Sequence, residues 1–445
     1  MPVTYTQFLT LIATALRDEN GLDLAYLIRP VSAHGKDLIK EFRNPTRQSM
    51  SRYEGAIENP WDEIAIQYVL VVTHVAKRRS ADAFKEHTQL VNLFLRFLTN
   101  NSGWTLPALF ATLRDLRDLA FDADVQAQDL SQKSDCMEEA ARIISKAFSN
   151  CVTDRCRPFV LLCSRGSTIP HICRTSSYQM SRKWGVYYVV GLVLKSYFRV
   201  RRISLSKNIL RALEANRDIP PLHEYPRAHQ VTYRYYLGML SFLNEDYTKS
   251  EQELTFAFYN CHLDARNNQT CASYLLEPYT CFISCCRRIL TYLIPLRILR
   301  GHLPSADLLR RFPVLEELYA PFISAIRKGD IQGFDTALDE CERRLVDLNV
   351  WLTLEKAREI CIRGLFRRVW VVSEKSNRIP VAMFHSSLQV SGMDVSSEEA
   401  ECLVANMIYN GYMRGYISHE KQMVVLANTN PFPRLADRPT PFMLY

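Results

Sequence analysis

The chain has 445 residues, of which 47% are hydrophobic and 23% are charged, with a formal net charge of +8. This length allows two or three domains with a large core, and the composition is that of an ordinary soluble protein. Because no apolar run reaches the roughly 18 residues that a membrane span needs, we expect no membrane association. Residues 1–16 form an amphipathic helix pattern without the basic start or cleavage site of a signal peptide.

Cysteine usage points to the compartment. The thirteen cysteines are odd in number and show no regular disulfide framework, which favours a reducing compartment such as the cytosol or nucleus.

From the N-terminus onward, one amphipathic helix pattern follows another, with short polar connections between them. We predict helices near residues 5–17, 62–79, 81–98, 106–121, 134–148, 187–198, 204–215, 229–243, 248–261, 288–299, 315–328 and 332–345. Short helices that each carry one apolar stripe must pack on their neighbours to bury it. The series therefore predicts an all-α helical solenoid.

One helix pair shows the chemistry of a structural repeat. Leu237-Gly238 lies on the first helix, residues 244–246 form a polar turn, and Leu254 and Ala257 lie on the second helix. These spacings approach the tetratricopeptide pattern, in which small residues let two helices pack closely. Residues 329–330, Gly-Asp, predict a similar break between two later helices.

In the last part of the chain the spacing of the apolar residues changes from a helical period to a strand period. A long helix pattern covers residues 351–372, a short one covers residues 379–390, and a capping-box spacing from Ser396 to Glu399 begins a third that runs to Met413. Residues 415–418 and 422–426 then read as two short strands. Three helices closed by a small β-hairpin is the order of elements in a winged helix, which usually docks on nucleic acid or on another winged helix.

Catalytic and metal-binding motifs are missing from the sequence. There is no Gly-rich phosphate loop, nucleophile elbow or His-Glu-x-x-His, and no Cys-x-x-Cys pair. The cysteines at 281, 285 and 286 near Cys261-His262 could suggest a metal site, but buried or loop thiols are the favoured interpretation. We expect no enzymatic activity, no cofactor and no metal.

Basic residues concentrate between residues 155 and 217, which contain thirteen Lys and Arg and one acid, Glu214. Such a concentration can attract phosphates or an acidic peptide. A solvated helix face without a partner is the alternative. The candidate residues for binding an acidic partner are Lys195, Arg199, Arg201, Arg202, Lys207 and Arg211.

The winged-helix region is nearly balanced in charge, with nine bases and eight acids in residues 351–428. Position is more informative than net charge, because bases at helix ends and at a wing tip can reach phosphates without reading sequence. We expect weak, sequence-independent and salt-sensitive binding to RNA or DNA, with ordinary surface charge as the alternative for any single residue. The candidates are Arg367, Arg368, Lys375, Arg378, Arg414 and Lys421.

A helical solenoid that runs into a winged helix is the architecture of PCI domains. Four sequence motifs are more specific to one family. They are VTYRYYLG at 231–238 with AFYNC at 257–261, ILTYLIP at 289–295, GHLP at 301–304, and GYISH at 415–419 followed by NPFP at 430–433. From about residue 5 to 435 the chain resembles the PCI-domain subunit of the TREX-2 messenger-RNA export complex and its close relative once assigned to the signalosome as subunit twelve.

The resemblance implies a non-enzymatic scaffold subunit of a nuclear complex that couples transcription to messenger-RNA export. It implies binding to a GANP-type scaffold protein, winged helix to winged helix, and to the small acidic protein shared with the proteasome lid. The paired winged helices would offer a basic face to nucleic acid. The expected location is the nucleus, with association to the nuclear pore and a cytoplasmic pool.

The resemblance also sets expected domain limits. It implies N-terminal helical repeats at residues 1–215, the helical part of the PCI domain at 216–350, the winged helix at 351–435 and a tail at 436–445. Residues 156–179 and 270–286 depart from the family pattern and read as inserts, either true insertions or retained introns. We predict that both form loops outside the core.

Three other functions stay open. The sister interpretation places the same fold in a related nuclear complex, with another PCI partner, that acts in transcription elongation or splicing or is associated with the signalosome. A long recognition helix rich in Arg and Asn would favour a stand-alone transcription factor, but residues 397–413 contain only Asn406 and Asn410 and no Arg. A signalosome-type isopeptidase would need a His-x-His metal motif, which the sequence lacks.

Overall fold

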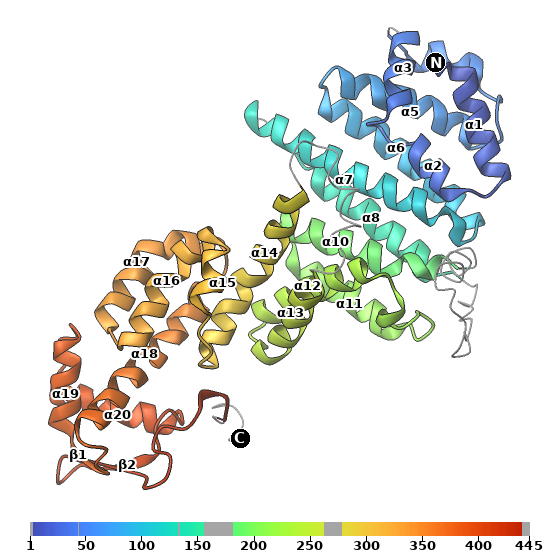
Figure 1. The fold of residues 1–445 in the computed structure, drawn as a ribbon. Helices are drawn as coiled ribbons and strands as arrows, with labels where there is room; N and C mark the ends of the chain where they lie inside the picture. Colours follow the sequence, from blue (N-terminus) through green and yellow to red (C-terminus); the bar gives the residue numbers. More distant parts are fainter. Residues whose placement is uncertain (1–2, 43, 132–133, 155–180, 262–277, 438–445) are drawn as a thin grey trace. The chain divides into compact units, whose positions relative to one another are not determined.

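The computed structural model describes residues 3–437 apart from residue 43 and residues 132–133, 155–180 and 262–277. Helices dominate these residues, and the strands among them all lie near the C-terminus (Figure 1). The chain divides into two compact units, Met1–Tyr236 and Leu237–Tyr445.

The first unit is a series of helices. Its α-helices are α1 (Tyr5–Arg17), α2 (Gly21–Leu27), α3 (Ala33–Glu41), α4 (Arg47–Met50), α5 (Trp61–Ala76), α6 (Ser80–Asn100), α7 (Leu106–Asp129), α8 (Cys136–Val152), α10 (Val186–Arg199) and α11 (Ser206–Ala215). Short 3₁₀ turns lie between them: η1 (Ser51–Tyr53), η2 (Gly103–Thr105), η3 (Arg182–Gly185), η4 (Ile203–Leu205) and η5 (Leu222–Glu224).

Consecutive helices of this unit pack on one another. The strongest packing joins α5 to α6, α6 to α7, and α8 to α10, while α7 also packs on α8 and on the short helix α2. A capping box begins α1: the Thr4 side chain accepts from the Gln7 N–H, and the Gln7 side chain accepts from the Thr4 N–H. From α1, Phe8 and Ile12 are fully buried on one stripe. Neighbour-on-neighbour packing confirms the predicted solenoid.

The second unit contains the rest of the chain. Its helices are α12 (Arg227–Leu243), whose last residues open the unit, α13 (Tyr247–Cys261), α14 (Pro278–Leu299), α15 (Ala306–Arg310), α16 (Pro313–Lys328), α17 (Ile331–Asp347), α18 (Trp351–Val372), α19 (Val381–Val390) and α20 (Ser397–Tyr409). Its strands are β1 (Arg378–Pro380), β2 (Gly415–Ser418) and β3 (Met423–Leu426), followed by the 3₁₀ turn η8 (Leu435–Asp437).

The predicted repeat pair is present at α12 and α13. A Cβ on Gly238 would lie 2.8 Å from the Leu254 Cγ, and the Ser250 hydroxyl donates to the Gly238 carbonyl at 2.8 Å. Leu254 and Ala257 are fully buried. The small residues therefore let the two helices approach closely, as the tetratricopeptide spacing predicts.

The winged helix has one strand more than predicted. The sheet has the order β1-β3-β2, with Ile379 opposite Val424 and Ile417 opposite the same residue on the other side. The predicted short helix from residue 379 is therefore wrong for its first two residues. Because a residue before proline is pushed toward extended conformations, Ile379 joins the sheet, and the helix begins after Pro380.

Two further differences concern the end of one helix and several short helices. The third winged-helix helix ends at Tyr409 rather than Met413, with Asn410 as its C-cap. The short helices α2, α3, α4 and α15 were not predicted. Four to nine residues are too few for a clear period, although Asn20 and Ser32 cap α2 and α3 through side-chain hydrogen bonds.

The predicted loop at residues 270–286 is wrong over residues 278–286. There the chain is helical, because α14 begins at Pro278, and Cys286 is 3% exposed. Proline suits the first turn of a helix, where its missing N–H has no partner to lose. Residues 270–277 and the other predicted insert, 156–179, lie outside the described residues.

Candidate nucleic-acid and partner interfaces

The six basic candidates of the winged helix are all exposed. None of them forms an ion pair with a carboxylate of the described chain. They do not form a single cluster, however, because they come from different elements. The structure divides them into a pair on α18, a pair at one end of the sheet, a loop lysine and a wing-tip lysine.

Arg367 and Arg368 lie on the last turns of α18, beside the end of α16. They help to line a groove of about 580 Å³ together with Arg327, Val371 and Val372. The Arg368 guanidinium donates to the Arg327 carbonyl at 2.8 Å, so it caps the end of α16. Arg367 has no such structural contact among the described residues and is the freer cation of the two.

Sequence reasoning missed Arg327 as a base of this groove. It precedes α18 in the chain and becomes a neighbour of Arg368 only through the packing of α16 on α18. Arg363 also lines the groove, but its guanidinium donates to the Pro433 carbonyl at 2.8 Å and lies 5.9 Å from the Phe432 ring centroid. It therefore holds the C-terminal segment.

The strand register places Arg378 and Arg414 at one end of the sheet and Lys421 at the other. Arg378 is opposite Val425, and the Arg414 carbonyl accepts from the Ala427 N–H, so both bases lie at the end of the sheet where β3 finishes. Lys421 lies in the turn between β2 and β3, at the other end. With about 3.3 Å per strand residue, the two ends are roughly 10 Å apart.

Lys375 lies in the connection from α18 to β1. Glu374 and Lys375 both have left-handed backbone conformations, with φ of 53° and 59°. The Lys375 N–H donates to the Trp370 carbonyl at 2.9 Å, which closes the helix end. This geometry turns the chain into the sheet and leaves the lysine exposed.

The outer face of the sheet combines aromatic, apolar and basic side chains. Residues directly opposite one another in an antiparallel sheet share a face, so Arg378, Val425 and Tyr416 lie together on the side away from buried Ile379 and Val424. Tyr416 is 63% exposed. We call these three residues the outer sheet face.

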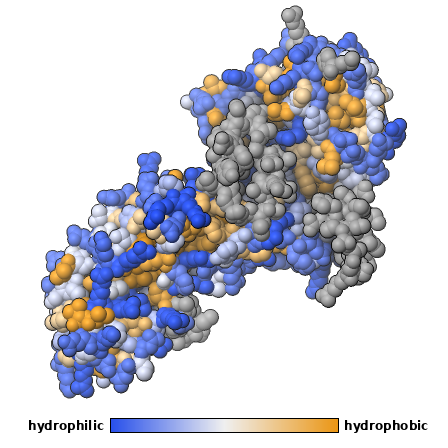
Figure 2. Space-filling view, in the orientation of Figure 1, coloured by the Kyte–Doolittle hydropathy of each residue, from blue (hydrophilic) through white to orange (hydrophobic). Residues whose placement is uncertain are grey.

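Other large apolar side chains are exposed on the same subdomain. Val372 ends α18, Val390 ends α19 and Tyr409 ends α20, and all three are more than half exposed. Figure 2 shows hydrophobic side chains at the surface of this part of the chain among mainly hydrophilic ones. Contiguous apolar patches mark interaction sites, whereas single exposed apolar side chains are common on soluble proteins.

The third helix does not carry the chemistry of a base-reading helix. α20 contains three glutamates and no Lys or Arg. Glu401 instead accepts from His419 Nδ1 at 2.9 Å across the fold. The hydrogen bond raises the pKa of His419 and lowers the pKa of Glu401.

The second basic cluster surrounds the connection from α10 to α11. Lys195 is half-buried, and Arg199 lies with its guanidinium carbon 4.7 Å from the Phe121 ring centroid. Arg202 lies 3.6 Å from the Glu138 carboxylate. Arg199 and Arg202 therefore make contacts within the unit.

Arg201, Lys207 and Arg211 are the members of this cluster that are exposed and make no ion pair with a described carboxylate. Lys207 and Arg211 are four residues apart on α11, and the buried side chains of that helix are Ser206 and Ile209. The two bases therefore share a solvent-facing stripe.

In the part of the chain that the structure describes, no group of three or more His, Cys, Asp or Glu could hold a metal ion. Cys261 and Cys286 are buried, whereas His262 and the side chains of residues 281 and 285 lie outside that part. Burial raises the pKa of Cys151 and of Cys361 to about 12, so these thiols stay protonated. No described helix is both long and apolar enough to span a bilayer.

Comparisons with known proteins agree with this architecture. A family model for the PCI domain matches residues 336–428, which include the winged helix. The chain is similar to the CSN12 homolog of Schizosaccharomyces pombe, with 35% identity over 396 residues that cover 86% of this chain and 85% of that protein.

Two other relatives extend the comparison. The CSN12 homolog of Mycosarcoma maydis is 33% identical over 433 residues, with 87% of each chain covered. PCI domain-containing protein 2 of Xenopus laevis is 27% identical over 439 residues, with 98% of each chain covered. The chain therefore belongs to the PCI-domain family of the CSN12 homologs, to which PCI domain-containing protein 2 is related.

Proposed function

We propose that this protein is a non-enzymatic scaffold subunit of a nuclear complex that couples transcription to messenger-RNA export. Its winged helix binds the winged helix of a GANP-type PCI protein, and a second surface binds the small acidic subunit shared with the proteasome lid. The proposed location is the nucleus, with association to the nuclear pore and a cytoplasmic pool.

The observation that carries the proposal is similarity along the whole chain to PCI domain-containing protein 2, which covers 98% of both proteins. The outer sheet face adds physical support, because an exposed tyrosine beside a valine and an arginine matches the composition of the central part of protein interfaces. The same subdomain exposes further apolar side chains at the ends of α18, α19 and α20.

The small acidic subunit requires a basic surface. Arg201, Lys207 and Arg211 supply three cations without an ion pair to a described carboxylate, whereas Arg199 packs on Phe121 and Arg202 pairs with Glu138. Charge complementarity of this kind speeds association and selects against basic partners.

Nucleic-acid binding is proposed as weak and independent of sequence. Exposed bases around α18 and the sheet can reach phosphates, whereas α20 lacks the Arg and Lys side chains that read guanine edges. This distribution favours backbone contacts and disfavours a stand-alone transcription factor.

The sister interpretation keeps the fold and the acidic partner but changes the PCI partner and the process, to transcription elongation or splicing or a signalosome-associated role. The similarity to CSN12 homologs, at 35% and 33% identity, favours this alternative. The two functions differ in which PCI protein is bound.

Affinity purification from the protein's own cells, with subunits identified by mass spectrometry, tests the proposal. Recovery of a GANP-type scaffold with the small acidic protein supports the export complex. Recovery of the acidic protein with a different PCI protein supports the sister complex. Recovery of neither contradicts both.

Nucleic-acid binding has a separate prediction. Replacing Arg367 and Lys421 by glutamine in the purified complex weakens binding to unrelated RNA and DNA by a similar factor. It also reduces the salt slope by about 1 for each lost phosphate contact.

Fluorescence anisotropy over a salt series measures both quantities. The matched control combines Arg310→Gln with Arg343→Gln, because it also removes two exposed cations. Equal binding by the double variant and the control contradicts a role for these bases.

A further inference from the structure

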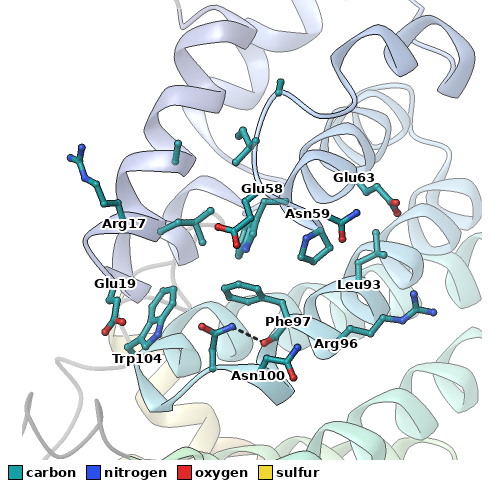
Figure 3. A pocket seen from close by; sticks show the side chains of 17 residues that line it. Arg17, Glu19, Glu58, Asn59, Glu63, Leu93, Arg96, Phe97, Asn100 and Trp104 are labelled. Carbon is teal, nitrogen blue, oxygen red and sulfur yellow. Dashed lines mark hydrogen bonds between the residues drawn. The ribbon is translucent and has the colours of Figure 1, made fainter.

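The first unit contains a cleft that the proposed function does not use. Its volume is about 950 Å³, and it lies between the end of α1, the chain before α5, the first turn of α5 and the second half of α6 (Figure 3). A cleft of this size suits a short peptide segment better than a single side chain.

Aromatic rings form part of the cleft wall. Phe97 lies edge-to-face with Trp61 at 5.2 Å and with Trp104 at 6.1 Å between ring centroids. This chain of contacts fixes the ring orientations. Trp61 is 1% exposed, and its Nε1–H has no hydrogen-bond partner among the described residues. A buried donor without a partner is unfavourable, and a ligand carbonyl would satisfy it.

The charges of the cleft are predominantly negative. Arg17 lines it but pairs with Asp18, Nε to Oδ1, at 3.2 Å. This leaves three carboxylates, Glu19, Glu58 and Glu63, against the Arg96 guanidinium, and none of the four forms an ion pair within the described chain. Figure 3 shows Glu19 beside Trp104 at one end of the cleft, Glu63 and Arg96 at the other, and Glu58 between them.

Carboxylates around aromatic rings match the chemistry of a cationic side chain. A guanidinium or ammonium group gains charge-assisted hydrogen bonds from the former and a cation–π contact from the latter. Asn59 and Asn100 add amide groups that can pair with a peptide backbone. The same charges repel nucleic acid and acidic proteins.

We propose that this cleft binds an extended, arginine- or lysine-containing segment of a partner protein. The site is distinct from both basic surfaces described above, and it recognises a partner of opposite charge. The chain as a whole has a net charge of +8, so its overall charge repels basic peptides. The local excess of carboxylates in the cleft attracts them instead.

Anisotropy with the purified full-length protein tests the proposal. The probe is a fluorescein-labelled octapeptide of alternating arginine and alanine, and the same peptide with glutamate in place of arginine serves as the negative probe. The wild type is expected to bind the arginine probe and not the glutamate probe. The double variant Glu58→Gln, Glu63→Gln is expected to bind the arginine probe about tenfold more weakly.

The double variant Asp339→Asn, Glu342→Gln is the matched control. It removes the same two charges from exposed positions of α17, so its affinity for the arginine probe should equal that of the wild type. Equal loss of affinity in both double variants would mean non-specific attraction and would overturn the proposal. Absence of binding by the wild type would also overturn it.

A third variant tests the aromatic wall. Phe97→Leu keeps a hydrophobic side chain at a half-buried position and removes the central ring. It should weaken binding of the arginine probe severalfold, measured well below the melting temperature of the variant. Unchanged affinity in this variant contradicts the cation–π contribution.

Discussion

Buried titratable side chains make the stability of the first unit depend on pH. His87 is fully buried on α6, and its Nε2 donates to the Thr112 carbonyl of α7 at 3.1 Å. Burial lowers the pKa of His87 from 6.5 to about 4. The folded protein therefore holds this imidazole neutral at pH values where the unfolded chain protonates it.

The first prediction follows from this difference. The stability from neutral His87 is present above pH 6.5 and is lost as the pH falls toward 4, because the unfolded state then binds more protons. Between pH 7 and pH 5 the loss is about 2 kcal/mol for one such histidine. Chemical denaturation at both pH values should show a smaller decrease for His87→Gln than for the wild type.

Comparison with a variant is essential here, because other groups also titrate. Burial raises the pKa of Asp115 to about 6, and that shift acts in the opposite direction. His223→Gln, at an exposed position, is the control and should keep the wild-type pH dependence. An identical pH dependence in His87→Gln and the wild type contradicts the account.

A buried ion pair joins the residues just after α8 to η3. The Arg182 guanidinium donates to Asp154 at 3.2 Å and to the Leu98 carbonyl at 2.9 Å, and the Arg182 N–H donates to Asp154 at 2.8 Å. Both side chains are at most 10% exposed. The pair holds together two points of the chain that are 28 residues apart.

The second prediction concerns this pair. Asp154→Asn leaves a buried guanidinium without its counter-charge, so the free energy of unfolding should fall by about 3 kcal/mol or more. Asp307→Asn breaks an exposed pair with Arg310 and should cost less than about 0.5 kcal/mol. Similar, small losses in both variants would contradict a structural role for the buried pair.

At the scale of elements, the packing of α16 on α18 depends on a glycine. Gly329 has φ of 67° and caps α16, and an added Cβ would lie 2.9 Å from the backbone N of Leu365 on α18. Gly364 lies at the same contact, where an added Cβ would be 3.3 Å from the Ile326 carbonyl. These two helices also carry the arginines of the groove, so the glycine contact sets the geometry of the candidate nucleic-acid surface.

The third prediction uses this contact. Gly329→Ala should lower the free energy of unfolding by about 2–4 kcal/mol, from left-handed strain and from collision with backbone atoms that cannot rotate away. Gly55→Ala is the matched control, because Gly55 has φ of 79° with open space around it. At Gly55 only the left-handed backbone strain lowers the free energy of unfolding, by about 1 kcal/mol. Equal losses in both variants would contradict the close approach.

The sequence predicted the elements better than it predicted the site. Helices with a long apolar stripe, such as residues 5–17 and 351–372, match the structure to the residue, because periodicity and capping both reside in local sequence. β1 was missed because a strand of three residues has no period and is defined by pairing with β3, which comes later in the chain.

The site depends on contacts that sequence spacing does not contain. Arg327 lines the groove only because α16 packs on α18. The strand register shows that Lys421 lies at the opposite end of the sheet from Arg378 and Arg414, and the sequence alone does not give this register. Arg199 and Arg202 looked like free cations in the sequence, yet they pack on Phe121 and pair with Glu138.

At the scale of the whole molecule, three charged surfaces of different character lie on the two units. The first unit carries a carboxylate-lined cleft and the bases around α11, and the second carries the groove and sheet of the winged helix. A scaffold subunit that binds several partners needs such separate surfaces, because opposite charges at different places exclude the wrong partner from each. The outer sheet face, with its exposed tyrosine, is the surface proposed for the second PCI protein.

Co-purification with a winged-helix variant tests this central claim most directly. Tyr416→Asp places a charge on the outer sheet face, and Tyr259→Asp places the same charge on α13; the two tyrosines are 63% and 62% exposed. Quantitative mass spectrometry should find that Tyr416→Asp loses the second PCI protein while keeping the small acidic subunit, and that Tyr259→Asp retains both. Retention of the PCI protein by Tyr416→Asp at the wild-type level would contradict docking through the winged helix.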